Sequence, residues 1–233
     1  MRGGLLSTVA DFLVEPLEPA SAEADRAWKR MARPVVAVAG LAPRCGTTTV
    51  ARALAAELAL RDDGGAAIVS TETVAGGGIP LGTPAAGRLG RAVQRSLPSQ
   101  TRAVGRICLT VAGPDHAAFV DAARDLAPLV LDVADAAGTS VAASLVDAVV
   151  LVAGPGTEPA LASVLAESLC RVGPEPVVVL NRDRDADERW DARCALRLPD
   201  ARMGAQLALA GREARGELGR RVAQLADLVA VAP

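Results

Sequence analysis

The sequence predicts an α/β protein, a doubly wound and mostly parallel β-sheet flanked by helices in three layers. Apolar runs such as 35–39 and 128–133 are continuous, as in strands buried on both faces of a parallel sheet. Segments with helical spacing of apolar residues alternate with these runs, which indicates right-handed βαβ units. A glycine-rich turn at 40–49 also connects the first apolar run to the first helical segment.

Strands and helices are expected to alternate from residue 34 onward. The first helix should cover 48–61, because Val50, Leu54 and Leu58 share one face and Asp62-Asp63-Gly64-Gly65 follows as a stop signal. The Gly/Pro-rich stretch 71–84 predicts a loop, and the charged stretch 182–193 predicts a solvated loop. The other elements are expected as strands at 66–70, 106–111, 128–133, 147–153, 176–180 and 195–198, and as helices near 86–97, 115–126, 139–146, 158–172, 201–210 and 213–229.

The composition is that of a globular chain with a core of small side chains. Of the 233 residues, 51% are hydrophobic, 22% are charged and only 2% are aromatic, so Ala, Val and Leu must build the core. The net charge of −2, without a long basic block, argues against specific nucleic-acid binding. The four cysteines lack Cys-x-x-Cys spacing and His116 is the only histidine, which favours reduced thiols in a cytoplasm over a zinc site or disulfides.

The chain divides into an N-terminal helical extension, residues 1–32, and one domain, residues 33–233. Leu5, Phe12 and Leu17 belong to a short amphipathic pattern in the extension, which favours docking on the domain or on a partner. Binding to a membrane surface is the alternative, but Asp11 and Glu15 disfavour an anionic membrane. No stretch approaches the roughly 18 apolar residues of a membrane span. Membrane contact is therefore expected to be peripheral at most.

The turn after the first strand lies where a phosphate-binding loop belongs. That loop has a glycine, four residues, a second glycine, a lysine, and a serine or threonine whose hydroxyl binds magnesium. Gly40, Gly46 and Thr48 fit this pattern, whereas Thr47 stands at the lysine position. Lys29 is the only lysine of the chain, so no nearby lysine replaces it. A simpler interpretation of the same residues is a helix N-cap provided by threonine.

Other segments follow the turn in a particular order. They are the strand Pro128-Leu129-Val130-Leu131-Asp132-Val133, the strand beginning at Asp147, the run Pro176-Val177-Val178-Val179-Leu180-Asn181-Arg182, and the tail from Leu198-Pro199-Asp200 to Leu225-Ala226-Asp227. This order resembles the MinD/ParA group of P-loop ATPases, the members of the SIMIBI class with a deviant Walker A loop. The resemblance spans about 34–230 and implies a P-loop NTPase fold for the domain.

The resemblance assigns roles to the loop residues. The family loop reads Lys-Gly-Gly-x-Gly-Lys-Thr-Thr, which places Ala42 and Thr47 at its two lysines and Pro43 and Arg44 at its first two glycines. Cys45 is either a small packing residue or a thiol with a lowered pKa near a helix N-terminus. The phosphate-binding loop expected from the resemblance therefore comprises Gly40, Pro43, Arg44, Cys45, Gly46, Thr47, Thr48 and Thr49.

Outside the loop, the resemblance implies a base site and a metal site. Asn181 and Arg182 should bind the base, while Thr48 and Asp132 should hold Mg²⁺ if a nucleotide binds. The family's aspartate after the second strand has no counterpart at Ser70-Thr71-Glu72.

These departures predict a nucleotide-binding protein with weak or absent ATPase activity. The two lysines and the aspartate stabilise charge during phosphoryl transfer, whereas backbone N–H groups can still bind ATP or ADP. Similar lysine-free loops occur in TadZ/CpaE-like pilus-localisation proteins and Ssd-like septum-site proteins, which implies positioning or assembly through protein partners. The family also implies a homodimer. The alternatives are a scaffold that binds no nucleotide and an active ATPase.

Overall fold

The computed structural model describes residues 33–70, 83–84, 87–96, 101–105, 107–111, 116–133, 136–183 and 187–231. The N-terminal extension predicted at 1–32 lies outside these residues, as does most of the loop predicted at 71–84. Within the described residues, no helix is long and apolar enough to cross a membrane.

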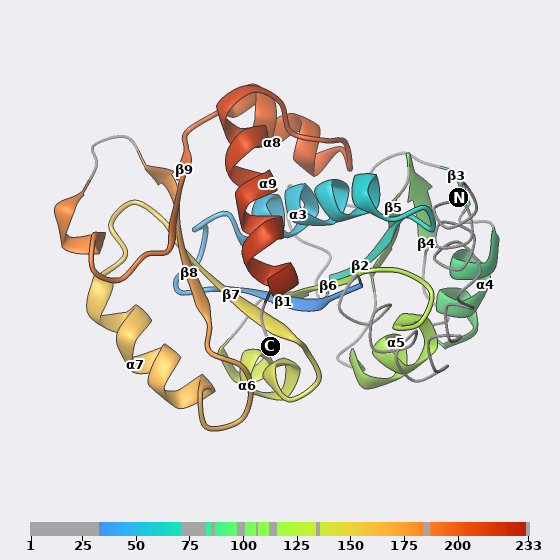
Figure 1. Ribbon diagram of the computed structural model, residues 1–233, viewed down its shortest axis with the longest axis horizontal. Coiled ribbons are helices and arrows are strands. Elements are labelled where there is room, and N and C mark those ends of the chain that lie inside the picture. Colours follow the sequence, from blue (N-terminus) through green and yellow to red (C-terminus); the bar gives the residue numbers. More distant parts are fainter. Residues whose placement is uncertain are drawn as a thin grey trace, which may run out of the picture.

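The described strands form one sheet in the order β3-β4-β5-β2-β6-β1-β7-β8-β9. Neighbouring strands are parallel except for the pairs β3–β4 and β4–β5 at one edge, so the predicted fold class is confirmed (Figure 1). The strand bounds are β1 Val35–Gly40, β2 Ala66–Ser70, β3 Thr83–Pro84, β4 Thr101–Val104, β5 Ile107–Val111, β6 Leu129–Val133, β7 Ala148–Ala153, β8 Val177–Asp183 and β9 Leu196–Pro199.

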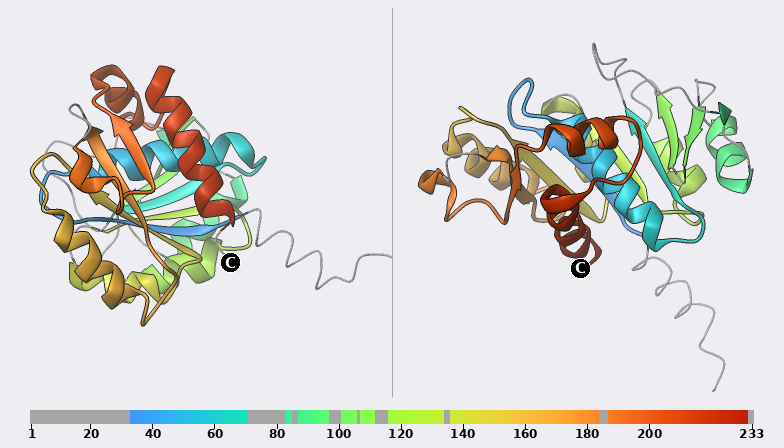
Figure 2. Two further views of the ribbon diagram at one scale, coloured as in Figure 1. Left: turned by 60° about the vertical axis from the view of Figure 1, so that its left-hand side comes forward. Right: turned by 90° about the horizontal axis from the view of Figure 1, so that it is seen from above.

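Helices cover both faces of the sheet and form the outer two of the three layers. One face packs against α3 (Thr47–Arg61), α8 (Arg202–Leu209) and α9 (Gly216–Val231). The opposite face packs against α4 (Gly87–Ser96), α5 (His116–Ala123), α6 (Ala136–Ala143) and α7 (Pro159–Leu169). In the left view of Figure 2 the sheet lies between α3, α8 and α9 on one side and α6 and α7 on the other.

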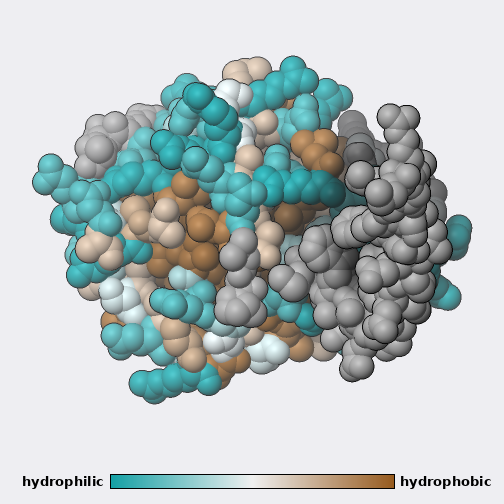
Figure 3. Space-filling model, viewed as in Figure 1, coloured by the Kyte–Doolittle hydropathy of each residue, from teal (hydrophilic) through white to brown (hydrophobic). Residues whose placement is uncertain are grey.

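The core consists mainly of Ala, Val and Leu, as the composition predicts. Successive residues of β1 belong alternately to two buried clusters, with Val36 and Val38 facing α3 and Val35, Ala37 and Ala39 on the other face. Because every residue of the central strands is covered on one face or the other, their sequences are continuously apolar. On the outer surface, apolar side chains gather between α7 and α9, over β8 and β9, and polar side chains border this area (Figure 3).

The topology places the predicted phosphate loop at the point where the strand order reverses. β1 pairs with β6 on one side and with β7 on the other, and all three strands run parallel. The crevice beyond the carboxyl ends of such strands is the usual ligand site of open α/β sheets. The β1–α3 turn lies in that position.

The sequence missed part of the sheet edge. β4 was not predicted, and residues 83–84, expected in a loop, pair with it as β3. β4 and β5 form a hairpin in which Val104 pairs with Ile107, and Gly105 in the turn has a φ of 57°. A glycine opening a two-residue connection is a hairpin signal, but β4 is too short for its periodicity to show.

The remaining differences concern element ends. β8 continues to Asp183, and a short 3₁₀ helix, Glu188–Trp190, lies within the stretch predicted as a loop. Trp190 is 1% exposed and packs in the cluster under α7, which explains why the charged stretch is locally ordered. The predicted helix at 139–146 begins and ends three residues earlier, at Ala136 and Ala143.

Candidate functional site

The turn between β1 and α3 leaves the first backbone N–H groups of the helix directed toward its entrance. Gly46 is the N-cap residue, with a φ of 92° and no side-chain capping bond, and α3 begins at Thr47. The first α-helical bond after it joins the N–H of Val50 to the carbonyl of Gly46 at 3.1 Å. The threonines therefore follow the cap and do not form it, and the start of α3 has the backbone geometry that favours an anion.

Inside the turn, two side chains fold back over the end of β1. The Oγ1 of Thr47 lies 3.2 Å from the Sγ of Cys45. A Cβ atom on Gly40 would lie 2.4 Å from that Oγ1 and 2.8 Å from that Sγ, so only glycine fits there. The position of the lysine thus holds a neutral hydroxyl close to the sheet. Cys45 is 2% exposed, which supports its packing role.

Asn181 and Arg182, the two residues predicted to bind the base, donate hydrogen bonds to the backbone of the loop. The Nδ2 of Asn181, at the end of β8, donates to the carbonyl of Cys45 at 2.9 Å, and Asn181 is only 6% exposed. The Nη2 of Arg182 donates to the carbonyl of Arg44 at 2.6 Å. Arg182 has a φ of 58°, an uncommon backbone conformation that lets consecutive side chains reach the same loop. Both residues thus fix the shape of the turn.

A cavity of about 320 Å³ opens beside the loop, on the side of α8 and α9. Gly46, Thr49, Asn181 and Arg182 line it, so predicted phosphate-binding and base-binding residues share one site. This volume lies at the lower end of the range of small-molecule pockets, about 300–1,000 Å³. The opposite wall is the connection from β9 to α8 and the first turn of α8, lined by Pro199, Asp200, Ala201, Arg202, Ala205 and Gln206.

This opposite wall was not predicted as part of the site. Its residues directly follow β9, which pairs in parallel with β8. Because the carboxyl ends of parallel strands meet at one edge of a sheet, the segment after β9 had to lie near Asn181. The strand expected at 195–198 thus carried a signal for the position of this wall.

Asp132 lies in β6 on the α3 face of the sheet, because Val130, two residues earlier, packs in the cluster of that face. It pairs with Val38 of β1 and with Ser70 of β2 in the sheet register, and it is 4% exposed. The Oγ of Ser70 donates to the Oδ2 of Asp132 at 2.5 Å. Ser70 is the last residue of β2. Thr71 and Glu72, which with Ser70 mark the place where a family aspartate was expected, lie outside the described residues.

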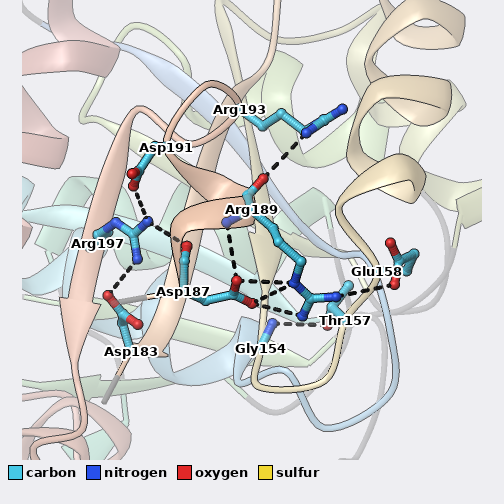
Figure 4. A network of polar contacts seen from close by, with 9 residues as sticks. All are labelled: Gly154, Thr157, Glu158, Asp183, Asp187, Arg189, Asp191, Arg193 and Arg197. Atoms are coloured by element: carbon cyan, nitrogen blue, oxygen red, sulfur yellow. Dashed lines mark hydrogen bonds and ion pairs between the residues drawn. The ribbon is translucent and has the colours of Figure 1, made fainter. Parts of the chain in front are cut away.

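A network of ion pairs and hydrogen bonds joins the described residues that follow β8 to β9 (Figure 4). Arg197 of β9 binds Asp183 at 2.8 Å and Asp191 at 2.6 Å, and its Nη2 donates to the carbonyl of Asp187 at 2.8 Å. The side-chain hydrogen bond from Arg189 holds the pKa of the Asp187 carboxyl below its usual value. A smaller cavity, of about 150 Å³, lies between this network and the turn after β7.

Solved structures have a similar fold. A ParA family ATPase from Chlorobium tepidum TLS superposes with a TM-score of 0.62 at 14% identity, covering 84% of this chain and 98% of that one. The chain has the ParA/MinD fold. The septum site-determining protein MinD from Pyrococcus horikoshii OT3, complexed with Mg-ADP, gives a TM-score of 0.54 at 15% identity, with 84% and 95% of the two chains covered.

A third match to the ParA/MinD fold is a complex. In the MinC:MinD cell division protein complex from Aquifex aeolicus, the TM-score is 0.57 at 12% identity, covering 84% of this chain and 95% of that one. Neither a protein-family model nor a curated protein matches the sequence. The likeness is therefore one of fold, and the residues of this chain must decide what the site does.

Proposed function

We propose that this chain binds a nucleotide through a degenerate phosphate loop, hydrolyses it slowly or not at all, and acts through protein partners. The observation that carries the proposal is the cavity shared by the start of α3 and the Asn181–Arg182 pair. Its position corresponds to the ligand crevice of doubly wound folds. ATP or ADP is the favoured ligand, because a MinD protein of the same fold is complexed with Mg-ADP.

Groups other than the missing lysines support the binding of a nucleotide. The helix start offers backbone N–H groups and the positive end of a helix dipole, which together favour an anion. The exposed Arg44 lies at the crest of the loop and Arg182 lines the cavity, so positive charge is available around the site. The cavity wall is mostly apolar, with Val50, Ala53 and Leu198 among its residues, which suits the flat face of a base.

Slow hydrolysis follows from the charges that the loop lacks. Thr47 and Ala42 replace both lysines of the family loop, and Ser70 ends the strand that would carry the aspartate. Losing one preorganised group that stabilises transition-state charge costs about 3–4 kcal/mol, or about 10²–10³ in rate. Several losses together leave little catalysis.

The protein partners and the cellular location are inferred from proteins with the same fold. A MinD protein forms a complex with MinC, and lysine-free members such as the TadZ/CpaE-like and Ssd-like proteins act in positioning or assembly. The apolar area over β8 and β9 supplies a surface for partner contact (Figure 3). We propose the cytoplasm as the location and a homodimer as the assembly.

The binding part of the proposal is tested by calorimetric titration of the full chain with ATP, ADP and GTP. We expect a single site for ATP or ADP with a dissociation constant in the micromolar to millimolar range. Asn181→Ala should weaken it, since the loop loses its buried anchor, whereas Arg193→Ala, on the exposed side of the β8–β9 connection, should not. Absence of heat for every nucleotide would favour the scaffold that binds none.

The catalytic part is tested by steady-state release of phosphate from ATP. We expect turnover far below about 1 s⁻¹, the lower end of typical enzyme rates. Thr47→Lys, alone and with Ala42→Lys, restores the family lysines and should raise turnover if the rest of the site is competent. Hydrolysis by the unmodified chain at ordinary enzyme rates would identify it as an active ATPase and contradict this part.

A further inference from the structure

Helix α4 presents a face of exposed arginines, here called the arginine face. Arg88, Arg91 and Arg95 are exposed and recur at helical spacing, so they lie on one side of the helix. Leu89 and Val93 pack into the core on the other side. The helix itself lies at the rim of the molecule, next to α5 and β4 (Figure 1).

The positive charge of the arginine face is not neutralised within the part of the chain that the structure describes. None of its three guanidinium groups forms an ion pair with another described residue. The neighbouring helix α5 carries an exposed acid, Asp121, which is likewise not paired with α4 there. By contrast, the exposed Arg189 and Arg220 are paired with acids close by in the sequence. Like charges three or four positions apart on a helix repel each other, so this face favours a partner with negative charge.

The chain contains an acidic stretch of matching charge in its N-terminal extension. Residues 11–25 include five acids and no basic residue, whereas residues 73–114, which contain α4, include five arginines and no acid. The acids are Asp11, Glu15, Glu18, Glu23 and Asp25. Complementary charge of this kind steers two surfaces together and disfavours other pairings. The arginine face and the acidic stretch are therefore matched in sign and in size.

The start of the described chain brings the acidic stretch within reach of α4. The Nε of Arg33 donates to the Oδ2 of Asp62 at 2.6 Å, and its Nη1 donates to the carbonyl of Asp125 at 2.8 Å. Asp125 lies two residues after the end of α5, the helix that packs against α4. Arg33 follows Asp25 by eight positions, which span up to about 28 Å when extended. Since a helix is about 10–12 Å wide, this length is enough to pass α5 and reach α4.

We infer that the arginine face of α4 is the docking site of the chain's own acidic segment, residues 11–25. Exposed ion pairs are individually weak, but a short linker gives the attached segment an effective concentration of about millimolar at the face. The docked segment occupies a surface that would otherwise take an external polyanion such as a nucleic acid. The inference is independent of the proposed nucleotide binding.

Cross-linking of the full chain with a carbodiimide, which joins carboxylates directly to amines, tests the contact. Lys29 is the only lysine, so Arg91→Lys keeps the charge of the arginine face and places one new amine on α4. Mass spectrometry should find this amine joined to an acid of residues 11–25. Arg212→Lys is the matched control and should give no such product, because Arg212 is exposed on the connection between α8 and α9, which cover the opposite face of the sheet.

Two cross-linking results would overturn the inference. In the first, the amine introduced by Arg91→Lys is joined only to acids of the described domain, such as Asp121. In the second, a mixture of unlabelled and isotope-labelled protein gives products only between two chains, which would assign the acidic segment to a second copy. Products within one chain support the inference.

Binding of a heparin oligosaccharide to the full chain tests whether the segment covers the face. The combined substitutions Asp11→Asn, Glu15→Gln and Glu18→Gln remove three acids of the segment and should uncover the face. Heparin should then bind about tenfold more tightly at low salt, and the gain should fall as salt is added. If the unmodified chain already binds heparin as tightly as this variant, the face is open to external polyanions and the inference is wrong.

Two further variants show whether such a gain belongs to the arginine face. The control for net charge removes three exposed acids far from α4, and heparin binding should change by less than about twofold. Its substitutions are Glu167→Gln, Glu175→Gln and Glu188→Gln. Adding Arg88→Gln, Arg91→Gln and Arg95→Gln to the variant without the segment acids should abolish the gain. A gain that persists without these arginines would contradict the assignment to α4.

Discussion

At the scale of single residues, the loop is shaped by contacts between backbone and side chains from distant strands. Gly46 has a φ of 92°, and a Cβ atom there would lie 2.2 Å from the Nδ2 of Asn181. The same Nδ2 donates to the carbonyl of the preceding residue, Cys45. Glycine is therefore required at position 46 for two reasons: its positive φ, and the closeness of the Asn181 side chain of β8. The loop and the end of β8 form one unit.

Gly46→Ala should destabilise the protein by about 3 kcal/mol and abolish nucleotide binding, because it adds a clash to an unfavourable backbone angle. Gly156→Ala is the matched control. Gly156 has a φ of 80°, but nothing lies within 4 Å of a Cβ placed there, so about 1 kcal/mol is expected. Urea denaturation followed by circular dichroism measures both. If both variants lose the same free energy of unfolding, the close approach of Asn181 to Gly46 adds no cost, which would contradict this prediction.

Cys108 gives the fold a dependence on alkaline pH. Burial in β5 raises the pKa of this thiol from 9.0 to about 11. In the unfolded chain the thiol loses its proton first, so the folded state loses relative stability as the pH rises from 9 towards 11. The loss should reach on the order of 2 kcal/mol.

Denaturation at several pH values compares the unmodified chain with Cys108→Ala. The variant starts from a lower stability because a buried group is removed, but its stability should fall less steeply above pH 9. Parallel curves for the two proteins would show that Cys108 ionises equally in the folded and unfolded states.

At the scale of elements, the connection between β8 and β9 forms the outer support of the site. Arg197 holds three parts of that connection, through Asp183, Asp191 and the carbonyl of Asp187. Asp183 lies two residues after Asn181, so the network keeps the end of β8 in place (Figure 4). The Arg197–Asp183 pair is partly buried, which makes it stronger than an isolated surface pair, whereas the side chain of Asp191 is 67% exposed.

Arg197→Met should lower the free energy of unfolding by about 1–2 kcal/mol and weaken nucleotide binding, because the end of β8 becomes free to shift. Arg215→Met is the comparison, since Arg215 forms an ion pair of 3.7 Å with side chains 80% and 45% exposed. It should change stability by less than about 0.5 kcal/mol. Hydrogen exchange of β8 and β9 would locate the effect, and unchanged exchange in Arg197→Met would contradict it.

At the scale of the whole molecule, the β1–α3 turn lies among the carboxyl ends of β6, β1, β7 and β8, with helices on both faces of the sheet. In the family resemblance, the first loop lysine reaches across a dimer to the nucleotide of the partner. Ala42 stands at that position. Any dimer of this chain should therefore depend little on ATP.

Sedimentation of the full chain with and without ATP tests this. We expect the same mass in both conditions, whatever that mass is. The double substitution of Ala42→Lys and Thr47→Lys should introduce an ATP-dependent increase in mass if the remaining interface is preserved. An ATP-dependent dimer of the unmodified chain would show that other residues have replaced the lysine.

Much of the fold and part of the site follow from the sequence. Strands such as 35–39 are apolar throughout, and this alone predicts burial on both faces. The loop positions Gly40, Gly46 and Thr48 are recognisable because the turn follows a strand and opens a helix. β3 and β4 were missed because short edge strands have too little periodicity. The ion-pair network was missed because an alternating run of charges is usual for a solvated loop.

The sequence by itself determined the layered α/β fold, the place of the loop and the absence of its lysines, because these are local patterns of periodicity, spacing and residue type. Only the tertiary structure showed that Asn181 and Arg182 hold the loop backbone and that the segment after β9 completes the cavity. The two hydrogen bonds join residues 136 and 138 positions apart, and the cavity depends on which segments share an edge of the sheet. They are set by strand order and helix packing, which act between segments and leave no short-range signal in the chain.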